Sequence, residues 1–384
     1  MTSWCILALV LAASVSASQN PPASEGPHAK LTSAQTSRAS SSINFDQLSQ
    51  AADRARSESR DDDAIRLYQQ ALNLRPDWPA GLWYLSTVLY EKERYADARD
   101  VLRRFLTQDT TAGPGWALLG MSEFQTREYS RSLDHLQRAM SLGLGDRKEM
   151  AQSVFYFVAV LRNRFEQYTE SMDLLMAMVK SGQPTDLLME PIGLAALRLP
   201  YLPREIPSDR RELVRLAGQA ALAVEAQRQE EAEKIFSAIV SHYPEEPGVH
   251  FLYGAYLMDL RPEDGMKEMK RELEISPFSV PARLRMAEQY INEEKPDEAQ
   301  QLAQQAVALE PASSSARLIL GESLIAQGKS AEGIVELEKS RDAAPGRVRT
   351  HWDLLRAYTA LGRAQDAKRE KEEIEKLNTP ASQP

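Results

Sequence analysis

The chain has 384 residues and a formal net charge of −9, with acidic and basic residues mixed along its length. It therefore lacks the basic stripe that a nucleic-acid-binding surface needs to neutralise phosphates. Its single cysteine, Cys5, excludes a disulfide within the chain and a zinc site built on paired cysteines.

The N-terminal segment has the pattern of a secretory signal peptide. Residues 4–15 form an apolar run, shorter than a membrane-spanning helix, that ends near Ser16 and Ala17. We expect residues 1–17 to be cleaved near Ala17 and the mature chain to be exported, periplasmic or extracellular. An uncleaved N-terminal anchor and a misassigned start codon are the alternatives. Residues 18–42 are rich in Ser, Ala, Pro and Gln and predict a disordered linker.

Two consecutive 34-residue windows, starting at Val280 and Ser314, share one pattern. Each has a small residue at its eighth place (Ala287, Gly321) and at its twentieth place (Ala299, Gly333). Each also has a proline at its thirty-second place, and apolar residues at helical spacing between these positions. The small residues allow two helices to cross closely, and the proline ends the second helix. The pattern predicts a helix–turn–helix unit that stacks on its neighbours.

The same pattern recurs before and after these windows. A first array, residues 45–185, has repeats starting near residues 45, 79, 113 and 152. A second array, residues 213–377, has repeats starting near residues 213, 247, 280, 314 and 348. Residues 378–384 are predicted to be a flexible tail. The sequence thus predicts an all-α solenoid of about nine repeats.

A proline-rich insertion, residues 186–212, separates the two arrays. It contains Pro191, Pro200, Pro203 and Pro207, with a short helix expected near residues 192–197. It is interpreted either as a cap on the first array or as a hinge or plug that lies in a binding groove.

The 34-residue pattern resembles the tetratricopeptide-repeat family. This resemblance implies a right-handed superhelix whose concave groove is lined by the first helix of each repeat and binds peptides or partner helices. The leader makes the chain look like an exported bacterial member of this kind. Such members resemble scaffolds for envelope, secretion or pilus assembly.

The resemblance also implies which places of each repeat face the groove, chiefly the fifth and twelfth. Here they are unusually apolar and aromatic, which predicts a surface that binds apolar-rich partner segments. The predicted groove residues are Trp83, Tyr90, Met121, Phe124, Tyr156, Phe251, Met258, Leu284, Ile291, Leu318, Ile325 and Trp352. The alternatives are that twelfth-place residues pack between repeats, or that the insertion covers them.

No motif in the sequence predicts catalysis or a cofactor. Residues 328–330 read Gly-Lys-Ser, but the preceding glycine has the wrong spacing for a phosphate-binding loop. The five histidines are scattered and predict no metal site, and His351 is expected to be a packed helix residue. We therefore expect a non-enzymatic protein scaffold with no cofactor, no metal and no small-molecule substrate. The alternative is a regulatory or substrate-presenting subunit of a protease or glycosyltransferase carried on another chain.

Overall fold

The computed structural model describes residues 35–378, and the side chains of residues 45–378. The predicted signal peptide, residues 1–17, and all but the first residue of the predicted tail, residues 378–384, lie outside the described residues. Helix α2 begins at Gln35, inside the segment that was expected to be a linker.

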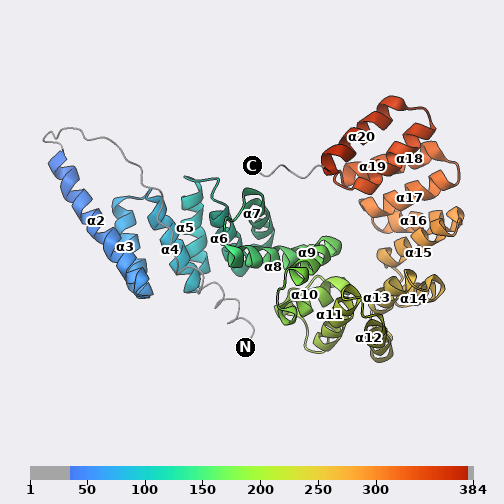
Figure 1. Cartoon of the computed structure of the whole chain (residues 1–384), viewed down its shortest axis with the longest axis horizontal. Helices are drawn as coiled ribbons and strands as arrows, with labels where there is room; N and C mark the ends of the chain where they lie inside the picture. The colour runs from blue at the N-terminus through green and yellow to red at the C-terminus, as the bar shows by residue number, and fades with distance from the viewer. Residues whose placement is uncertain (1–34, 379–384) are drawn as a thin grey trace. The chain divides into compact units, whose positions relative to one another are not determined.

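The described residues form helices and no strand, so the predicted all-α fold is confirmed (Figure 1). The α-helices are α2 (Gln35–Ser57), α3 (Asp61–Leu74), α4 (Pro79–Glu91), α5 (Tyr95–Leu106), α6 (Gly113–Gln125), α7 (Tyr129–Leu142), α8 (Lys148–Arg164), α9 (Tyr168–Lys180), α10 (Thr185–Ala196), α11 (Arg211–Glu225), α12 (Gln229–His242), α13 (Val249–Met258), α14 (Pro262–Ile275), α15 (Val280–Asn292), α16 (Pro296–Leu309), α17 (Ser314–Ala326), α18 (Ser330–Ala343), α19 (Val348–Ala360) and α20 (Ala364–Asn378). A short 3-10 helix, η1 (Pro203–Glu205), follows α10.

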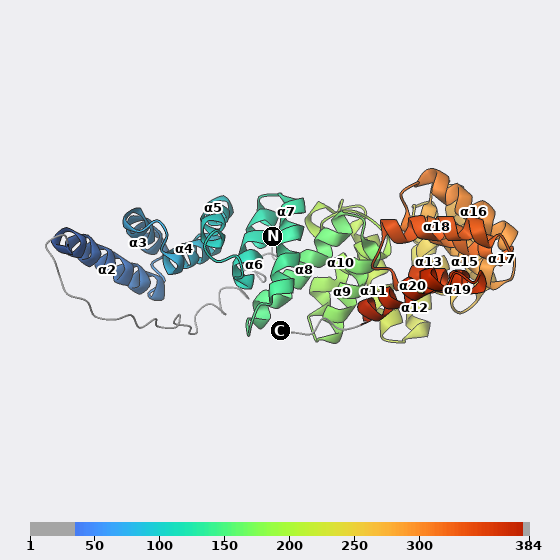
Figure 2. The same ribbon diagram turned by 90° about the horizontal axis from the view of Figure 1, so that it is seen from above.

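The chain divides into two compact units, Met1–Arg211 and Glu212–Pro384, here called unit 1 and unit 2. Within unit 1, helices α2 to α9 form four antiparallel pairs that follow one another (Figure 2). Within unit 2, helices α13 to α20 form four pairs, and α11 and α12 form a fifth that packs through Ala220, Ala223, Ala232 and Phe236. The described part of the chain therefore contains nine helix pairs, as the repeat pattern predicted. None of the described helices is long and apolar enough to span a membrane.

Close crossing of the two helices in a pair depends on the predicted small residues. A Cβ atom added to Gly321 would lie 2.8 Å from Leu337 Cγ and 2.9 Å from the carbonyl oxygen of Gly333. A Cβ atom added to Gly333 would lie 2.6 Å from Ile325 Cγ1. Ala287 and Ala299 are fully buried in the preceding pair. The prediction that small residues mark the helix crossings is confirmed.

The turn inside a pair uses a left-handed backbone residue in every described pair except α13–α14. In the regular part of each unit this residue recurs every 34 positions, at Ser59, Glu93 and Arg127 and again at Glu294, Gly328 and Gly362. Glycine adopts a positive φ without steric cost, whereas other L-residues do not. Of these six residues, only Gly328 and Gly362 are glycines. The non-glycine residues Ser59, Glu93, Arg127 and Glu294 therefore carry local backbone strain.

The turns between pairs in unit 2 are held by the residue at the fourth place of the next repeat. A side-chain nitrogen there donates to the carbonyl oxygen of the proline six residues earlier. The four pairs are His250–Pro244 (3.0 Å), Arg283–Pro277 (2.6 Å), Arg317–Pro311 (2.7 Å) and His351–Pro345 (2.8 Å). His351 is buried, as predicted, and its other ring nitrogen contacts Glu370 at 2.6 Å. These histidines and arginines therefore have structural partners.

The insertion differs from its prediction in extent. The helix expected near residues 192–197 begins at Thr185 and ends at Ala196, so α10 is much longer and contains Pro191. Helix α10 packs against α8 and α9 of unit 1. The chain between α10 and α11 is irregular apart from η1.

Candidate protein-binding site

The predicted groove residues lie on the first helices of seven pairs: α4, α6, α8, α13, α15, α17 and α19. The second, fifth, ninth and twelfth places of a repeat are three or four residues apart, so they share one side of their helix. We call this side the helix-A face, and each unit has its own.

Five predicted groove residues are buried by other parts of the chain: Tyr90, Met121, Phe124, Met258 and Leu318. Their expected exposure was wrong, because neighbouring helices cover them. The Phe124 ring lies 4.6 Å from the Phe157 ring of the next pair, and the Tyr90 ring lies 5.1 Å from the Tyr95 ring. Burial also raises the pKa of the Tyr90 hydroxyl above its ordinary value. The alternative that twelfth-place residues pack between repeats therefore holds for Phe124, and for Met258, which shares a buried cluster with Ala282 and Met286 of the next pair. Tyr90 packs on Tyr95 of its own pair.

Six others are half-buried at the edges of the apolar clusters: Trp83, Tyr156, Phe251, Leu284, Ile291 and Ile325. They contribute packing on one side and leave part of the side chain accessible. Trp352, in the last pair of unit 2, differs from them because 47% of it is exposed. It is the most accessible of the predicted groove residues.

The insertion covers part of the helix-A face of unit 1. Helix α10 brings Glu190 close to Tyr156, whose pKa is raised by burial and by this carboxylate. Leu202, in the irregular chain after α10, is 1% exposed and belongs to the same apolar cluster as Phe124 and Phe157. The alternative that the insertion covers predicted groove residues therefore holds at this end of unit 1.

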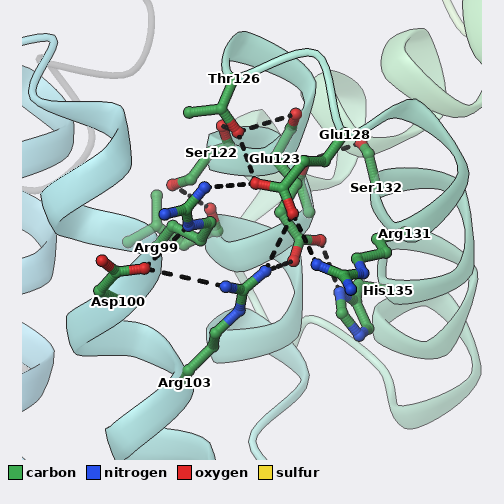
Figure 3. A network of polar contacts seen from close by, with 12 residues as sticks. Arg99, Asp100, Arg103, Ser122, Glu123, Thr126, Glu128, Arg131, Ser132 and His135 are labelled. Carbon is green, nitrogen blue, oxygen red and sulfur yellow. Dashed lines mark hydrogen bonds and ion pairs between the residues drawn. The ribbon is translucent and has the colours of Figure 1, made fainter.

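A polar network joins α5 to the pair α6–α7 (Figure 3). Its centre is Glu123, which is 0% exposed, although its place in the repeat normally holds an apolar residue. Arg103 Nη2 donates to Glu123 at 2.9 Å, and His135 Nδ1 lies 2.6 Å from its other oxygen. A buried carboxylate needs such partners, because leaving it unpaired would destabilise the fold. This network holds two repeats together, and its only signal in the sequence is an acidic residue at a place that is apolar in most other repeats.

The same network contains Glu128 in the turn before α7. It accepts hydrogen bonds from Arg99, from Arg131 at 2.9 Å and from Arg103 at 3.1 Å. Burial acts to raise the pKa of Glu128, but the guanidinium groups outweigh it and lower the pKa to about 2. Glu128 is therefore an anion at all ordinary pH values.

The helix-A face of unit 2 carries a line of ion pairs that crosses four successive pairs. Arg285 on α15 pairs with Asp259 at the end of α13 and lies 3.6 Å from Glu288. Arg349 on α19 bonds Glu288 on α15 at 3.1 Å and Glu322 on α17 at 2.7 Å. These charges lie outside the fifth and twelfth places and were not predicted. The recurrence of Glu288 and Glu322 at the ninth place was the signal that could have revealed them.

The line ends in a carboxyl pair, Glu322 and Asp353. Burial raises the pKa of Glu322 to about 7, helped by the nearby Asp353 carboxyl group and opposed by Arg349. Asp353 is buried, and its Oδ1 accepts from Arg356. Repulsion from the Asp353 carboxylate also disfavours ionisation of Glu322. The helix-A face of unit 2 is thus apolar at Ile325 and Trp352 and polar along the adjacent line.

Among residues 45–378, no group of three or more His, Cys, Asp or Glu side chains is placed to hold a metal ion. The polar clusters described above are ion pairs and hydrogen bonds within the fold.

Comparison with known families identifies the repeat type. Residues 50–115 and 284–348 match the family model described as "Tetratricopeptide repeat". One match falls in unit 1 and the other in unit 2. The fold is a helical-repeat solenoid of the tetratricopeptide type.

No curated protein matches the sequence significantly. Among solved structures, MamA residues 41 to the end from Desulfovibrio magneticus is 20% identical, with 42% of this chain and 90% of that chain covered and a TM-score of 0.36. The anaphase-promoting-complex hetero-tetramer Cut9–Hcn1 is 14% identical, with coverages of 87% and 66% and a TM-score of 0.40. Yeast Tom70 is 14% identical, with coverages of 85% and 97% and a TM-score of 0.35. All three TM-scores are low, and none of these proteins indicates a partner for this chain.

Proposed function

We propose that this protein is a non-enzymatic scaffold that binds segments of partner proteins on its helix-A faces. We further propose that it is exported and serves cell-envelope or secretion-related assembly. The export proposal rests on the signal-peptide pattern of residues 1–17. Sequencing the N-terminus of the mature protein from fractionated cells tests it. A chain that starts at Ser18 outside the cytoplasm would support export, and a membrane-bound chain that retains Met1 would support the uncleaved anchor.

Trp352 is the observation that carries the binding proposal. A large aromatic side chain that is nearly half exposed at a groove position exposes apolar surface that a partner could bury. Burial of such an anchor contributes roughly 1.5–3 kcal/mol to binding. Half-buried Ile325 lies on the same side of the preceding first helix.

The charges beside Trp352 indicate the chemistry of the partner segment. Glu288, Glu322 and Arg349 place both signs of charge along the same face. Complementary charges set the orientation and specificity of a complex more than its affinity. The partner segment we propose is therefore apolar at its centre, with charged residues of both signs beside the apolar anchors.

Capture by variants of the full-length chain tests the proposal. Trp352→Ala removes the anchor, whereas Val335→Ala is a matched control because Val335 is 46% exposed on α18, a second helix. Crosslinking pull-downs from the cell envelope should lose specific proteins with Trp352→Ala and retain them with Val335→Ala. Equal capture by both variants and the native chain would show that the helix-A face of unit 2 is not the binding surface.

A further inference from the structure

The chain between α10 and α11 contains a short segment that lies on unit 1 in the manner of a bound peptide. We call residues 199–206 the connector. Its backbone is extended at Leu202 (φ −82°, ψ 154°) and at Ile206 (φ −61°, ψ 120°), on either side of η1. It contains Pro200 and Pro203, and prolines favour extended conformations of this kind. The connector is thus an extended, proline-containing segment seated on helices.

Two consecutive residues at the end of α8 hold the backbone of the connector. Asn163 Nδ2 donates to the carbonyl oxygen of Leu199 at 2.7 Å and lies 3.4 Å from that of Tyr201. Arg164 Nη1 donates to the carbonyl oxygen of Pro200 at 2.9 Å. Asn163 is at the twelfth place of its repeat, where the resemblance put a groove-facing residue. Contacts to main-chain oxygens do not depend on the side chains of the bound segment, so another segment could make them.

The side chains of the connector supply specificity. Leu202 is buried in the apolar cluster that contains Phe124 and Phe157. The Arg204 guanidinium lies 5.6 Å from the centre of the Phe124 ring and donates to the Tyr129 hydroxyl. The site therefore favours a segment that carries a leucine and, two residues after it, an arginine.

One polar atom of the site is left without a partner. Asn163 is buried, and its Oδ1 accepts no hydrogen bond from any described residue. The connector is poorly suited to satisfy this oxygen, because neither Pro200 nor Pro203 has a backbone N–H. A buried acceptor without a donor is unfavourable. A segment with a non-proline residue in place of Pro200 would bring an extra N–H donor to this part of the site.

We propose that Phe124, Tyr129, Asn163 and Arg164 form a binding site for an extended segment of a partner protein. The segment that fits carries a leucine anchor, an arginine two residues after it and a backbone N–H where the connector has Pro200. The connector occupies the site as a built-in competitor, and the partner segment replaces it. This proposal does not depend on the Trp352 surface, because it concerns a different unit and is tested without any partner from the cell.

The test uses the full-length chain with residues 199–206 replaced by Gly and Ser at the same length. The probe is a fluorescent synthetic peptide of residues 197–208, and binding is measured by fluorescence anisotropy. The replaced chain should bind the peptide saturably, and the native chain should bind at least about tenfold more weakly because its connector competes. A Leu202→Ala peptide should lose most of its affinity, and a Pro200→Ala peptide should bind several-fold more tightly.

Several results would overturn the proposal. One is absence of binding to a replaced chain whose circular dichroism matches that of the native chain. Another is equal binding to the native and replaced chains. Equal affinity of the native and Pro200→Ala peptides would refute the role given to the free Asn163 oxygen.

A milder variant keeps the proposal testable if the replaced chain fails to fold. Arg204→Gln removes the guanidinium contacts and leaves Leu202 in place. Hydrogen exchange at residues 199–206 should then rise at least several-fold, and peptide binding should become measurable. Unchanged exchange together with no peptide binding would count against a replaceable connector.

Discussion

Replacing Gly321 by alanine tests whether close helix crossing holds the repeats together. The added Cβ atom would lie 2.8 Å from Leu337 Cγ and 2.9 Å from the Gly333 carbonyl oxygen. Leu337 can move in part, but the carbonyl oxygen belongs to the backbone of α18 and cannot move without shifting that helix. Overpacking of this kind costs about 1–3 kcal/mol. Alanine regains up to about 1 kcal/mol through its higher helix propensity. We therefore expect a net loss of about 1–2 kcal/mol.

Hydrogen exchange measured by mass spectrometry reports this loss locally, in α17 and α18. A loss of 1–2 kcal/mol raises the open population, and hence the exchange rate, by roughly 5- to 30-fold. Gly346→Ala is the matched control, because a Cβ atom added there has no atom within 4 Å. If Gly321→Ala exchanged at the rate of the native chain and of the control, the crossing argument would be refuted.

Three further substitutions test the turns and the carboxylates. Arg127→Gly should stabilise unit 1 by about 0.5–1 kcal/mol in thermal unfolding, because Arg127 has a φ of 65°, which glycine adopts without steric cost. A lowered melting temperature would contradict this. The pKa of Glu128 is lowered to about 2, because guanidinium hydrogen bonds such as that from Arg99 outweigh burial. The contribution of Glu128 to the stability of the fold is therefore present above pH 4.5 and is lost as the pH falls towards 2. The native chain should exceed Glu128→Gln in unfolding free energy by about 2 kcal/mol at pH 7, and this difference should vanish in acid; a difference that is constant with pH would refute it. The pKa of Glu322 is raised to about 7 by burial and Asp353, so the native chain should lose stability as the pH rises from 4.5 to 7. Glu322→Gln should abolish this loss, and an unchanged pH profile would show that Glu322 is not its source.

The sequence predicted the helix pairs well because their geometry depends on residues close together in the chain. Gly321 and Gly333 are twelve positions apart, and the contact they allow forms within one repeat. The 34-residue interval between repeats was therefore enough to predict the helix pairs. The left-handed turn residues were missed because only Gly328 and Gly362 have the residue type that indicates such a backbone.

The candidate site was harder to predict because exposure depends on what packs on a residue from elsewhere. Phe124 is at a groove place, yet it is buried: Phe157 of the next pair packs on its ring, and Arg204 of the connector lies over it. Asn163 hydrogen-bonds Leu199, which lies 36 positions away in the chain, and no periodic pattern indicates this contact. Trp352, in the last pair of unit 2, stays exposed. Helical register thus fixed the side of the helix on which a residue lies, but not whether that residue reaches solvent.

Site-specific photocrosslinking tests the central claim, that the helix-A face binds partner proteins, most directly. A photoreactive amino acid is placed at position 352 on α19 in one protein and at position 335 on α18 in another, and each is irradiated in its own cells. Both positions are similarly exposed, so they have similar access to solvent and differ in the helix that carries them. The account predicts discrete crosslinked partners from position 352 and none of these from position 335. The same partners crosslinked equally from both positions, or from position 335 alone, would contradict it.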